Sequence, residues 1–565
     1  MDHRTVSSDV LIIGAGIAGL RAAYEASVAG CSVRVVSRGP RCSAVIAGFN
    51  APVGPGDSVE LFEADINRSG DTVNDPVLAK VLAAGASDEV RFLEREGFSF
   101  AKREDGSFDL LKPLHCSVPR LVNCGTATGA EEERLLLEKL EERGVAVDAP
   151  VSIIKLLTSD GAVCGALGVR GPVSADGDDA FTVYSAKAVI MAAGGCGGLF
   201  EVSTYPGAIR GDSAALAYDA GAEITNMEFI DREPLSLLVP DALKGAPLSS
   251  TMLFAGAKLT NADGEDIISK FFGDAAEMSK GALSRAIFEE IGAGRGTEHG
   301  GVWFDCRALS REELLEHENY LPVLEKNGID LSRERVEVAP SVHTCLGGVR
   351  IDEKCRSTVP GLFAAGEAAG NIHGAGRIGG NAGTEVLVFG AIAGRSAAEY
   401  AKDSALMDAA AEECAIEAVD ALCSRIKSGA APAHEYKKEI RRIVSEGFPM
   451  VCGEACLERM ERAVHKEREK LACVSDSPFD IAGFAEALNM LTTAEIIASS
   501  ALARKESRGV FFRSDHPGRR LDLENINTVV FLESGCMKTI RRRHHSCSLT
   551  TEDKELIYQL ENGGW

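Results

Sequence analysis

Three glycines near residue 14 have the type and spacing that bind the pyrophosphate of a dinucleotide. Gly14, Gly16 and Gly19 form a G-x-G-x-x-G pattern directly after the apolar run VLII at 10–13. Gly14 permits a tight turn, Gly16 lets the backbone approach the phosphates, and Gly19 lets a helix pack closely on the strand. The N-terminus of that helix adds unpaired N–H groups and a positive dipole end. The alternative is a bare structural turn, since 59 glycines make chance matches easy.

The elements that must position these glycines follow in the right order. The run at 10–13 suits a buried parallel strand, a helix is expected over Leu20–Ala29, and a second strand over Ser32–Ser37. This βαβ order favours the dinucleotide site over the bare turn. One position departs from the pattern, because Ser37 and Arg38 stand where an acid is expected to bind a ribose. A serine hydroxyl can still hydrogen-bond a ribose hydroxyl, only more weakly.

A second glycine-rich segment lies far along the chain. Residues 358–394 read TVPGLFAAGEAAGNIHGAGRIGGNAGTEVLVFGAIAG. Between the two segments, residues 188–198 form another buried strand that ends in small residues, as if the backbone passes close to a ligand. We predict that the two segments hold the two ends of one FAD molecule within one folded unit.

Composition restricts the class of protein. A chain of 565 residues is too long for one core, and contents of 45% apolar and 25% charged residues are typical of a soluble globular protein. The net charge of −24 argues against nucleic acid or an anionic membrane as a partner. We expect no transmembrane segment, because no apolar run is long enough. The first strand begins too early to leave room for a signal peptide, so a cytoplasmic location is expected.

The cysteines predict neither disulfides nor metal ligands. A large cytoplasmic enzyme is expected to keep its 16 cysteines as free thiols. The sequence has no C-x-x-C, and the nearest group, Cys452 and Cys456, is interpreted as two small apolar residues on one helix. We therefore predict no metal site and no iron–sulfur cluster in the chain itself.

The predicted fold class is α/β. A Rossmann-like FAD-binding domain takes residues 1–235 and 336–400, and an inserted α+β capping domain takes residues 236–335. Residues 401–510 are rich in Ala, Glu, Lys and Arg at helical period, which predicts a C-terminal helical domain. The tail, 511–565, is expected to be irregular.

Several stretches resemble the flavoprotein subunit of the succinate dehydrogenase/fumarate reductase family, which includes L-aspartate oxidase. They cover most of residues 8–515. The matching stretches are GAGIAGLRAA, RGD at 210–212, NMEF at 226–229, SRAIFEEIGAGRG with GVWFDCR, HTCLGGV from His343, and the block TVPGLFAAGEAAGNIHGAGRIGGN. The chain is identified as a divergent member. The resemblance implies an active site at the flavin, between the FAD-binding and capping domains.

The resemblance also implies the chemistry. Hydride moves between flavin N5 and one carbon of a C–C bond next to a carboxylate, in a reductase or dehydrogenase acting on CH–CH, while a protonated side chain exchanges a proton with the neighbouring carbon. Arg377 stands at the family's substrate-carboxylate arginine, and an arginine grips a carboxylate at two points as lysine cannot. His343 stands at its substrate-binding histidine.

The FAD-binding positions combine the glycine motif with this resemblance. Glu367 matches the family's acid on the ribose side of FAD, and Asn381 belongs to the loop near the flavin, although Ala382-Gly383-Thr384 replace the usual S-L-L. The predicted FAD-binding residues are Gly14, Gly16, Ala18, Gly19, Ser37, Arg38, Gly48, Ala193, Gly194, Asp212, Gly366, Glu367 and Asn381.

Two departures from the family concern the substrate. The pattern M-E-F-x-x-x-H-P-T reads MEFIDREPL here, so that Glu233 replaces a substrate histidine and Leu235 a threonine. A carboxylate there repels a substrate carboxylate, and a leucine cannot hydrogen-bond one. We expect Arg377 and His343 to hold one carboxylate, and Glu233 to meet an amine, an amide or a hydroxyl.

A third departure concerns proton transfer. Lys280 stands at the family's proton-transfer arginine. Burial beside other cations would lower its pKa and suit it to this task. Arg285, the retained second arginine, is a rival for the role, and a structural salt bridge is its other interpretation.

The flavin and its partners complete the expectations. Covalent members of the family have a histidine in S-H-T-x-x-x-x-G-G, whereas residues 41–48 contain none, so we predict non-covalent FAD. The substrate is expected to be a small carboxylate other than plain succinate or fumarate. Electrons would pass to an iron–sulfur partner subunit, through which the protein could associate with a membrane, or to a soluble acceptor. An L-aspartate oxidase-like enzyme and an FAD-binding electron-transfer subunit without turnover are the alternatives.

Overall fold

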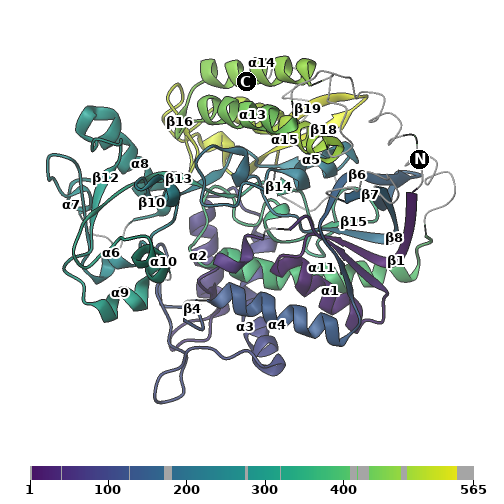
Figure 1. The fold of residues 1–565 in the computed structure, drawn as a ribbon, viewed down its shortest axis with the longest axis horizontal. Coiled ribbons are helices and arrows are strands. Elements are labelled where there is room, and N and C mark those ends of the chain that lie inside the picture. Colours follow the sequence, from purple (N-terminus) through teal and green to yellow (C-terminus); the bar gives the residue numbers. More distant parts are fainter. Residues whose placement is uncertain are drawn as a thin grey trace.

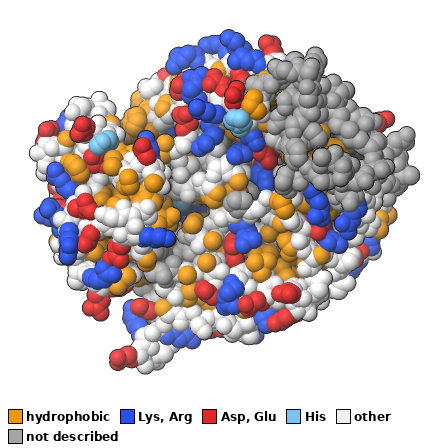
Figure 2. Space-filling model, viewed as in Figure 1, with side chains coloured by type: hydrophobic (Ala, Val, Ile, Leu, Met, Phe, Trp, Pro, Cys, Tyr) orange, Lys and Arg blue, Asp and Glu red, His pale blue; other side chains and the backbone are white. Residues whose placement is uncertain are grey.

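The computed structural model describes residues 3–39, 41–125, 127–170, 181–273, 278–318, 320–406, 417, 432–471 and 480–543. Figure 1 shows a large α/β body, a smaller lobe beside it on the left, and a helical layer at the top. The largest buried hydrophobic cluster runs through the body and the helical layer, and a second cluster lies within the lobe. Acidic and basic side chains are interspersed over the face seen in Figure 2, so the net charge of −24 does not gather there into one patch.

A mixed sheet forms the centre of the body. Its strands are β1 (His3–Ile13), β2 (Val33–Val36), β5 (Ala146–Asp148), β6 (Val151–Ser159), β7 (Ala162–Arg170), β8 (Phe181–Met191) and β15 (Leu362–Ala364). Their order is β5-β2-β1-β8-β7-β6, with β15 also paired to β8. β1 pairs in parallel with both β2 and β8, so the carboxyl ends of these three strands meet at one edge. Ligands of α/β sheets bind at that edge.

The two glycine-rich segments meet through their helices. α1 (Ile17–Val28) follows the first segment and packs on α11 (Asn381–Lys402), which begins within the second. Their close approach needs glycine, since a Cβ at Gly394 would lie 2.3 Å from the carbonyl oxygen of Ala22. Other elements of the body are α2 (Val59–Gly70), α3 (Pro76–Glu96), α4 (Thr128–Glu142), α5 (Asp212–Asp219), β3 (Phe49–Asn50) and β4 (Leu121–Val122).

The lobe is an α+β capping domain. Its antiparallel sheet has the order β10-β13-β12-β11, formed by β10 (Ile230–Leu237), β11 (Lys258–Thr260), β12 (Val302–Asp305) and β13 (Val336–Cys345). Its helices are α6 (Met252–Ala255), α7 (Ile267–Phe271), α8 (Lys280–Glu290), α9 (Arg311–His317) and α10 (Leu321–Lys326). β10 crosses the predicted boundary at 235, and β13 begins at the predicted start of the second part of the FAD-binding domain. The two domains are therefore joined through a pair of neighbouring strands.

The predicted tail, 511–565, is described over residues 511–543, and the expectation that it is irregular is wrong there. β17 (Phe512–Arg513) pairs with β16 (Val451–Cys452), while β18 (Ile526–Glu533) and β19 (Cys536–Arg543) form a hairpin. β18 also pairs with β9 (Ile224–Thr225), which in turn pairs with β14 (Gly348–Val349). Val529 and Val530, opposite β9, are fully buried. This segment is a strand because a distant part of the chain offers it a partner.

The helical layer consists, in the part of the chain that the structure describes, of α13 (Ala433–Gly447), α14 (Glu454–Lys470) and α15 (Asp480–Ala503). Of the helices in the described ranges, α15 is the one that is long and apolar enough to cross a membrane. However, 72% of its apolar window is buried inside the protein, where it packs on α13, α14 and α5. This burial is typical of a core helix.

Candidate active site

A cavity of about 730 Å³ is lined by residues from both the body and the capping domain. It opens at the carboxyl ends of β1, β2 and β8 and reaches residues 247–251 and 315–318 of the capping domain. Its lining includes the predicted FAD-binding residues Gly14, Gly16, Ala18, Ser37, Arg38, Gly48, Ala193, Gly194, Asp212, Gly366 and Glu367, and the predicted substrate residues Glu233, Lys280, His343 and Arg377. The structure thus brings together positions spread over most of the chain.

The glycine motif forms one wall of this cavity. Gly14 has φ +116°, and a Cβ there would lie 2.1 Å from the carbonyl oxygen of Ala192 at the end of β8. Gly19 lies behind the wall, where a Cβ would come within 2.0 Å of the Gly14 carbonyl oxygen. At the N-terminus of α1 the N–H of Ile17 donates to the Ser43 hydroxyl at 3.1 Å. The turn is therefore packed tightly on its protein side, while its other side faces the cavity.

The Arg38 side chain forms ion pairs with two acidic side chains at the cavity wall. Its guanidinium donates to Asp212 at 2.8 Å and lies 3.1 Å from Glu486 of α15. Burial disfavours its charge, but Asp212 and Glu486 outweigh this and raise the pKa of Arg38. The arginine ties the helical layer to the body, and Ser37 beside it also lines the cavity.

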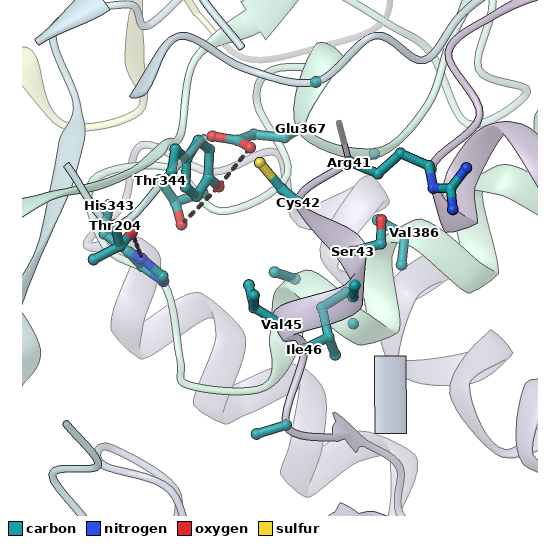
Figure 3. A pocket seen from close by; sticks show the side chains of 18 of the residues that line it. Arg41, Cys42, Ser43, Val45, Ile46, Thr204, His343, Thr344, Glu367 and Val386 are labelled. Atoms are coloured by element: carbon teal, nitrogen blue, oxygen red, sulfur yellow. Dashed lines mark hydrogen bonds between the residues drawn. The ribbon is translucent and has the colours of Figure 1, made fainter. Parts of the chain in front are cut away.

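Glu367 is a buried carboxyl in the cavity wall. The Tyr205 hydroxyl donates to one of its oxygens at 2.6 Å, and the Cys345 N–H donates to the other at 2.8 Å. Burial outweighs both bonds and raises the pKa of Glu367 to about 8. At neutral pH the carboxyl is therefore mostly protonated and can donate a hydrogen bond. Figure 3 shows Glu367 beside Cys42, with His343 and Thr204 further along the cavity.

Asn381 does not line the cavity. It is the first residue of α11, and its Oδ1 accepts a 2.6 Å bond from the Asn50 side chain. Its Nδ2 is buried without a hydrogen-bond partner. The neighbouring residues Gly380, Ala382 and Gly383 form the lining instead. Asn381 thus supports the loop from behind.

Arg377 is a buried cation whose hydrogen-bonding capacity is only partly used. It donates to the carbonyl oxygen of Ile378 at 3.1 Å and to the Thr344 hydroxyl at 3.3 Å. Asp231 lies 3.6 Å from its Nη2, which is too long for a hydrogen bond. Its Nε and the Asp231 Oδ2 are both buried without partners. Unused donors of this kind fit an incoming carboxylate.

His343 lies near Arg377 at the carboxyl end of β13. Its Nδ1 is 2.7 Å from the Thr204 hydroxyl, as Figure 3 shows. Burial, Lys280 and Arg377 together hold the pKa of His343 well below 6.5. The imidazole is therefore neutral at physiological pH. When Thr204 donates to Nδ1, the ring proton of His343 is on Nε2. The Nε2–H can then donate a hydrogen bond to a substrate oxygen.

Glu233 and Lys280 form an ion pair within the cavity lining. β10 carries Glu233, and Lys280 is the first residue of α8. Their side chains are only 8% and 12% exposed, so neither charge is well hydrated. Burial raises the pKa of Glu233, and Lys280 opposes this shift. The two departures from the family pattern are thus a matched pair of opposite charges.

Two positions considered for the substrate end do not reach the cavity. Arg285 points outward from α8, where it pairs with Glu289 at 2.7 Å and is 44% exposed. Arg285 therefore forms a salt bridge, which was its alternative interpretation. Leu235 is fully buried in the hydrophobic core of the capping domain and is absent from the cavity lining. Leu235 therefore belongs to the core of the capping domain and not to the cavity wall.

The lining residues that the sequence did not predict include Thr204, Tyr205, Thr344 and Glu318. The first three hold or extend His343, Glu367 and Arg377. Thr344 could have been found, because it directly follows His343. Glu318 lies in a segment without a recognisable motif, and nothing in the sequence distinguishes it from the other acids nearby.

The lining fits FAD. The Gly14–Gly19 turn and the start of α1 present backbone to the cavity, and the volume exceeds that needed for a small substrate alone. The lining histidines in the described ranges are His317 and His343, and neither belongs to residues 41–48.

Comparisons with known proteins define the class. The chain matches the family models described as FAD binding domain, over residues 9–382, and fumarate reductase flavoprotein C-term, over residues 437–553. FAD is therefore its cofactor, and the α/β fold class is confirmed. The chain belongs to the succinate dehydrogenase/fumarate reductase flavoprotein family and is an FAD-dependent oxidoreductase acting on CH–CH groups.

Individual relatives cover nearly the whole chain. It is 34% identical over 536 residues to one subunit of the fumarate reductase (CoM/CoB) of Methanothermobacter marburgensis, a match covering 92% of this chain and 96% of that protein. It is 32% identical over 538 residues to L-aspartate oxidase of Streptomyces coelicolor, covering 91% and 90%. A structure of FrdA of E. coli quinol fumarate reductase superposes with a TM-score of 0.88 at 25% identity, covering 97% and 98%.

Proposed function

We propose that the protein transfers hydride between flavin N5 and a C–C bond adjacent to a carboxylate, on a small substrate other than plain fumarate or succinate. The observation that carries this proposal is the buried Arg377 side chain, which lines the cavity together with Thr344 and His343 and whose Nε has no hydrogen-bond partner. A bound carboxylate would use these donors and would also orient the reacting carbons. Bound FAD supplies the hydride chemistry.

The proposed proton donor is Lys280. Among the lysine and arginine residues of the cavity lining, Lys280 is the one that belongs to the capping domain, and it is paired with Glu233. In the reductive direction its ammonium gives a proton to the carbon next to the one that receives hydride, and in the oxidative direction the neutral amine takes it back. Glu233 holds the Nζ in position through both states.

The charges of the lining support a substrate other than a dicarboxylate. Arg377 has Asp231 at 3.6 Å, and Lys280 is paired with Glu233. A second substrate carboxylate would have to displace a buried acid from its cation, which is unfavourable at low local dielectric. A substrate with one carboxylate needs no such displacement.

Two further features belong to this proposal. We propose that FAD is bound non-covalently, since residues 41–48 offer no histidine. We also propose an electron-transfer partner subunit, such as an iron–sulfur protein, or a soluble acceptor, because the described residues contain no metal-ligand cluster of their own.

The test is anaerobic reoxidation of the reduced flavin. The purified protein is reduced with dithionite, and fumarate, crotonate and amino-substituted 2-enoates are added separately while the oxidised flavin band is followed. Reoxidation by a mono-carboxylic 2-enoate, faster than by fumarate, is expected. Faster turnover of fumarate than of every mono-carboxylate would refute the substrate assignment.

L-aspartate oxidase activity is the second candidate, favoured by the Streptomyces coelicolor relative. Glu233 and Lys280 argue against it, because the family's oxidases usually have the histidine and the arginine at these positions. Anaerobic bleaching of the oxidised flavin by L-aspartate would establish this candidate. If neither enoates nor L-aspartate changes the flavin, the remaining alternative is an electron-transfer subunit without its own turnover.

A further inference from the structure

Glu318 is a buried carboxyl in the capping-domain side of the cavity, directly after α9. It is only 3% exposed. One of its oxygens accepts the Ser249 N–H at 2.8 Å and the other accepts the Tyr320 N–H, also at 2.8 Å. Each oxygen therefore keeps an unused lone pair, and the two bonds fix the direction of the carboxyl group.

The surroundings of Glu318 contain hydrogen-bonding groups but no cation of its own. The Ser249 and Thr251 hydroxyls are 2.7 Å apart, and His317 Nδ1 lies 3.2 Å from the Thr251 hydroxyl. Glu233, already paired with Lys280, is the charged group that acts on Glu318 from the facing strand, and Glu316 and His317 precede Glu318 in the chain. Among the ion pairs of the described residues, none includes Glu318.

Glu318 therefore differs from the acids that face Arg377 and Lys280. Arg377 and Lys280 face Asp231 and Glu233, and Glu318 is the acid left over. Burial and Glu233 raise the pKa of Glu318 to about 7, against the two N–H bonds, as expected of a carboxylate that lacks a counter-ion. A ligand that places a cation beside Glu318 would supply the counter-ion that this carboxylate lacks.

We propose that Glu318 is a specificity-determining residue that binds a protonated amine on the substrate whose carboxylate is held by Arg377. This inference rests on the proposed function and narrows its substrate to an amino-substituted 2-enoate or the saturated amino acid formed from it. The ammonium donates to the free lone pairs of Glu318, and the Ser249 and Thr251 hydroxyl oxygens can accept its other N–H groups. Glu318 takes no part in hydride or proton transfer.

The test compares three substrates that differ in one group: crotonate, 4-hydroxycrotonate and 4-aminocrotonate. Longer amino-2-enoates are included, so that the distance between the two substrate groups is varied as well. Reoxidation of the reduced holoprotein is followed under anaerobic conditions. We expect the best amino compound to exceed crotonate in kcat/KM by about 10- to 100-fold, the range for a hydrogen bond between charged groups. The hydroxyl compound should fall between them.

Glu318→Gln removes the charge and Glu316→Gln is the matched control, because Glu316 is an exposed acid two residues away on the same rim. Glu318→Gln should abolish the amine preference by lowering kcat/KM for the amino compound toward that for crotonate, whereas Glu316→Gln should retain the preference. A purely structural role would lower the turnover of all three substrates together and would overturn the inference. Flavin content and Tm establish that both variants fold.

The wild-type protein provides a test that needs no variant. Since amine binding favours the ionised carboxyl, the KM of the amino compound should fall as pH rises through about 7. The KM of crotonate should not follow this trend. If crotonate reoxidises the flavin without any amine preference, this inference fails while the proposed function stands. If no enoate reoxidises it, both fail.

Discussion

The flavin end of the cavity is formed mainly by backbone, whereas the substrate end is formed by charged side chains. At the flavin end, backbone packs against backbone, as where Gly14 meets the Ala192 carbonyl. At the substrate end, charged side chains from separate elements face each other, as in the Lys280–Glu233 pair. The first arrangement admits almost no change without loss of the fold, whereas the second can be altered by single substitutions. A cofactor can thus be retained within a family while the substrate changes.

The largest effect is expected at the flavin end. Gly14→Ala places a Cβ 2.1 Å from a backbone oxygen at φ +116°, so the β1–α1 turn must move. We expect loss of bound FAD and little folded protein, measured by flavin absorbance and Tm. Gly30→Ala is the control, because Gly30 also has positive φ (+86°) but open space around its Cβ position. It should retain FAD and lose about 1 kcal/mol of stability. Equal effects of the two substitutions would contradict the packing argument.

At the substrate end, Arg377→Lys should leave the flavin bound but remove most activity. Lysine keeps the positive charge yet cannot reproduce the two-point grip of a guanidinium. We expect kcat/KM for the best enoate to fall about a thousandfold, with normal flavin content and Tm within a few degrees. A loss of FAD in this variant would show that a substitution at the substrate end also disturbs FAD binding, which would contradict the comparison.

Lys280→Met should have the next largest effect. Removal of the proposed proton donor should slow flavin reoxidation by about a hundredfold with a smaller change in KM. It also leaves Glu233 buried without its counter-ion, so the free energy of unfolding should fall by about 3 kcal/mol. The double variant Glu233→Gln/Lys280→Met should regain stability without regaining rate. Recovery of both would mean that Lys280 only neutralises Glu233.

The same division explains what could be predicted from the sequence. The glycine motif, the strand at 10–13 and the two FAD segments were predictable, because steric limits on backbone leave a local pattern. β18 and β19 were not, since their strand form depends on pairing with β9. Glu318 could not be singled out either. Its burial and its bond to Ser249 arise only when two loops of the capping domain meet.

Arg285 illustrates an error that helical geometry could have prevented. It and Lys280 both belong to α8, and their separation in the chain turns the two side chains about 140° apart. Only one of them can face the cavity, and the structure places Lys280 there and Arg285 in a surface pair with Glu289. A motif match reports identity at a position but not the direction in which the side chain points.

The smallest effect is therefore expected for Arg285→Ala. Its pair with Glu289 is exposed on both sides and follows i,i+4 spacing, an arrangement that contributes about 0.5 kcal/mol or less. Its stacking over the Phe512 ring adds a contact between the capping domain and the C-terminal segment. We expect kcat/KM within about twofold of wild type and a small decrease in Tm, measured beside Lys280→Met. A loss as large as that of Lys280→Met would mean that the capping domain rotates during turnover and brings Arg285 to the substrate.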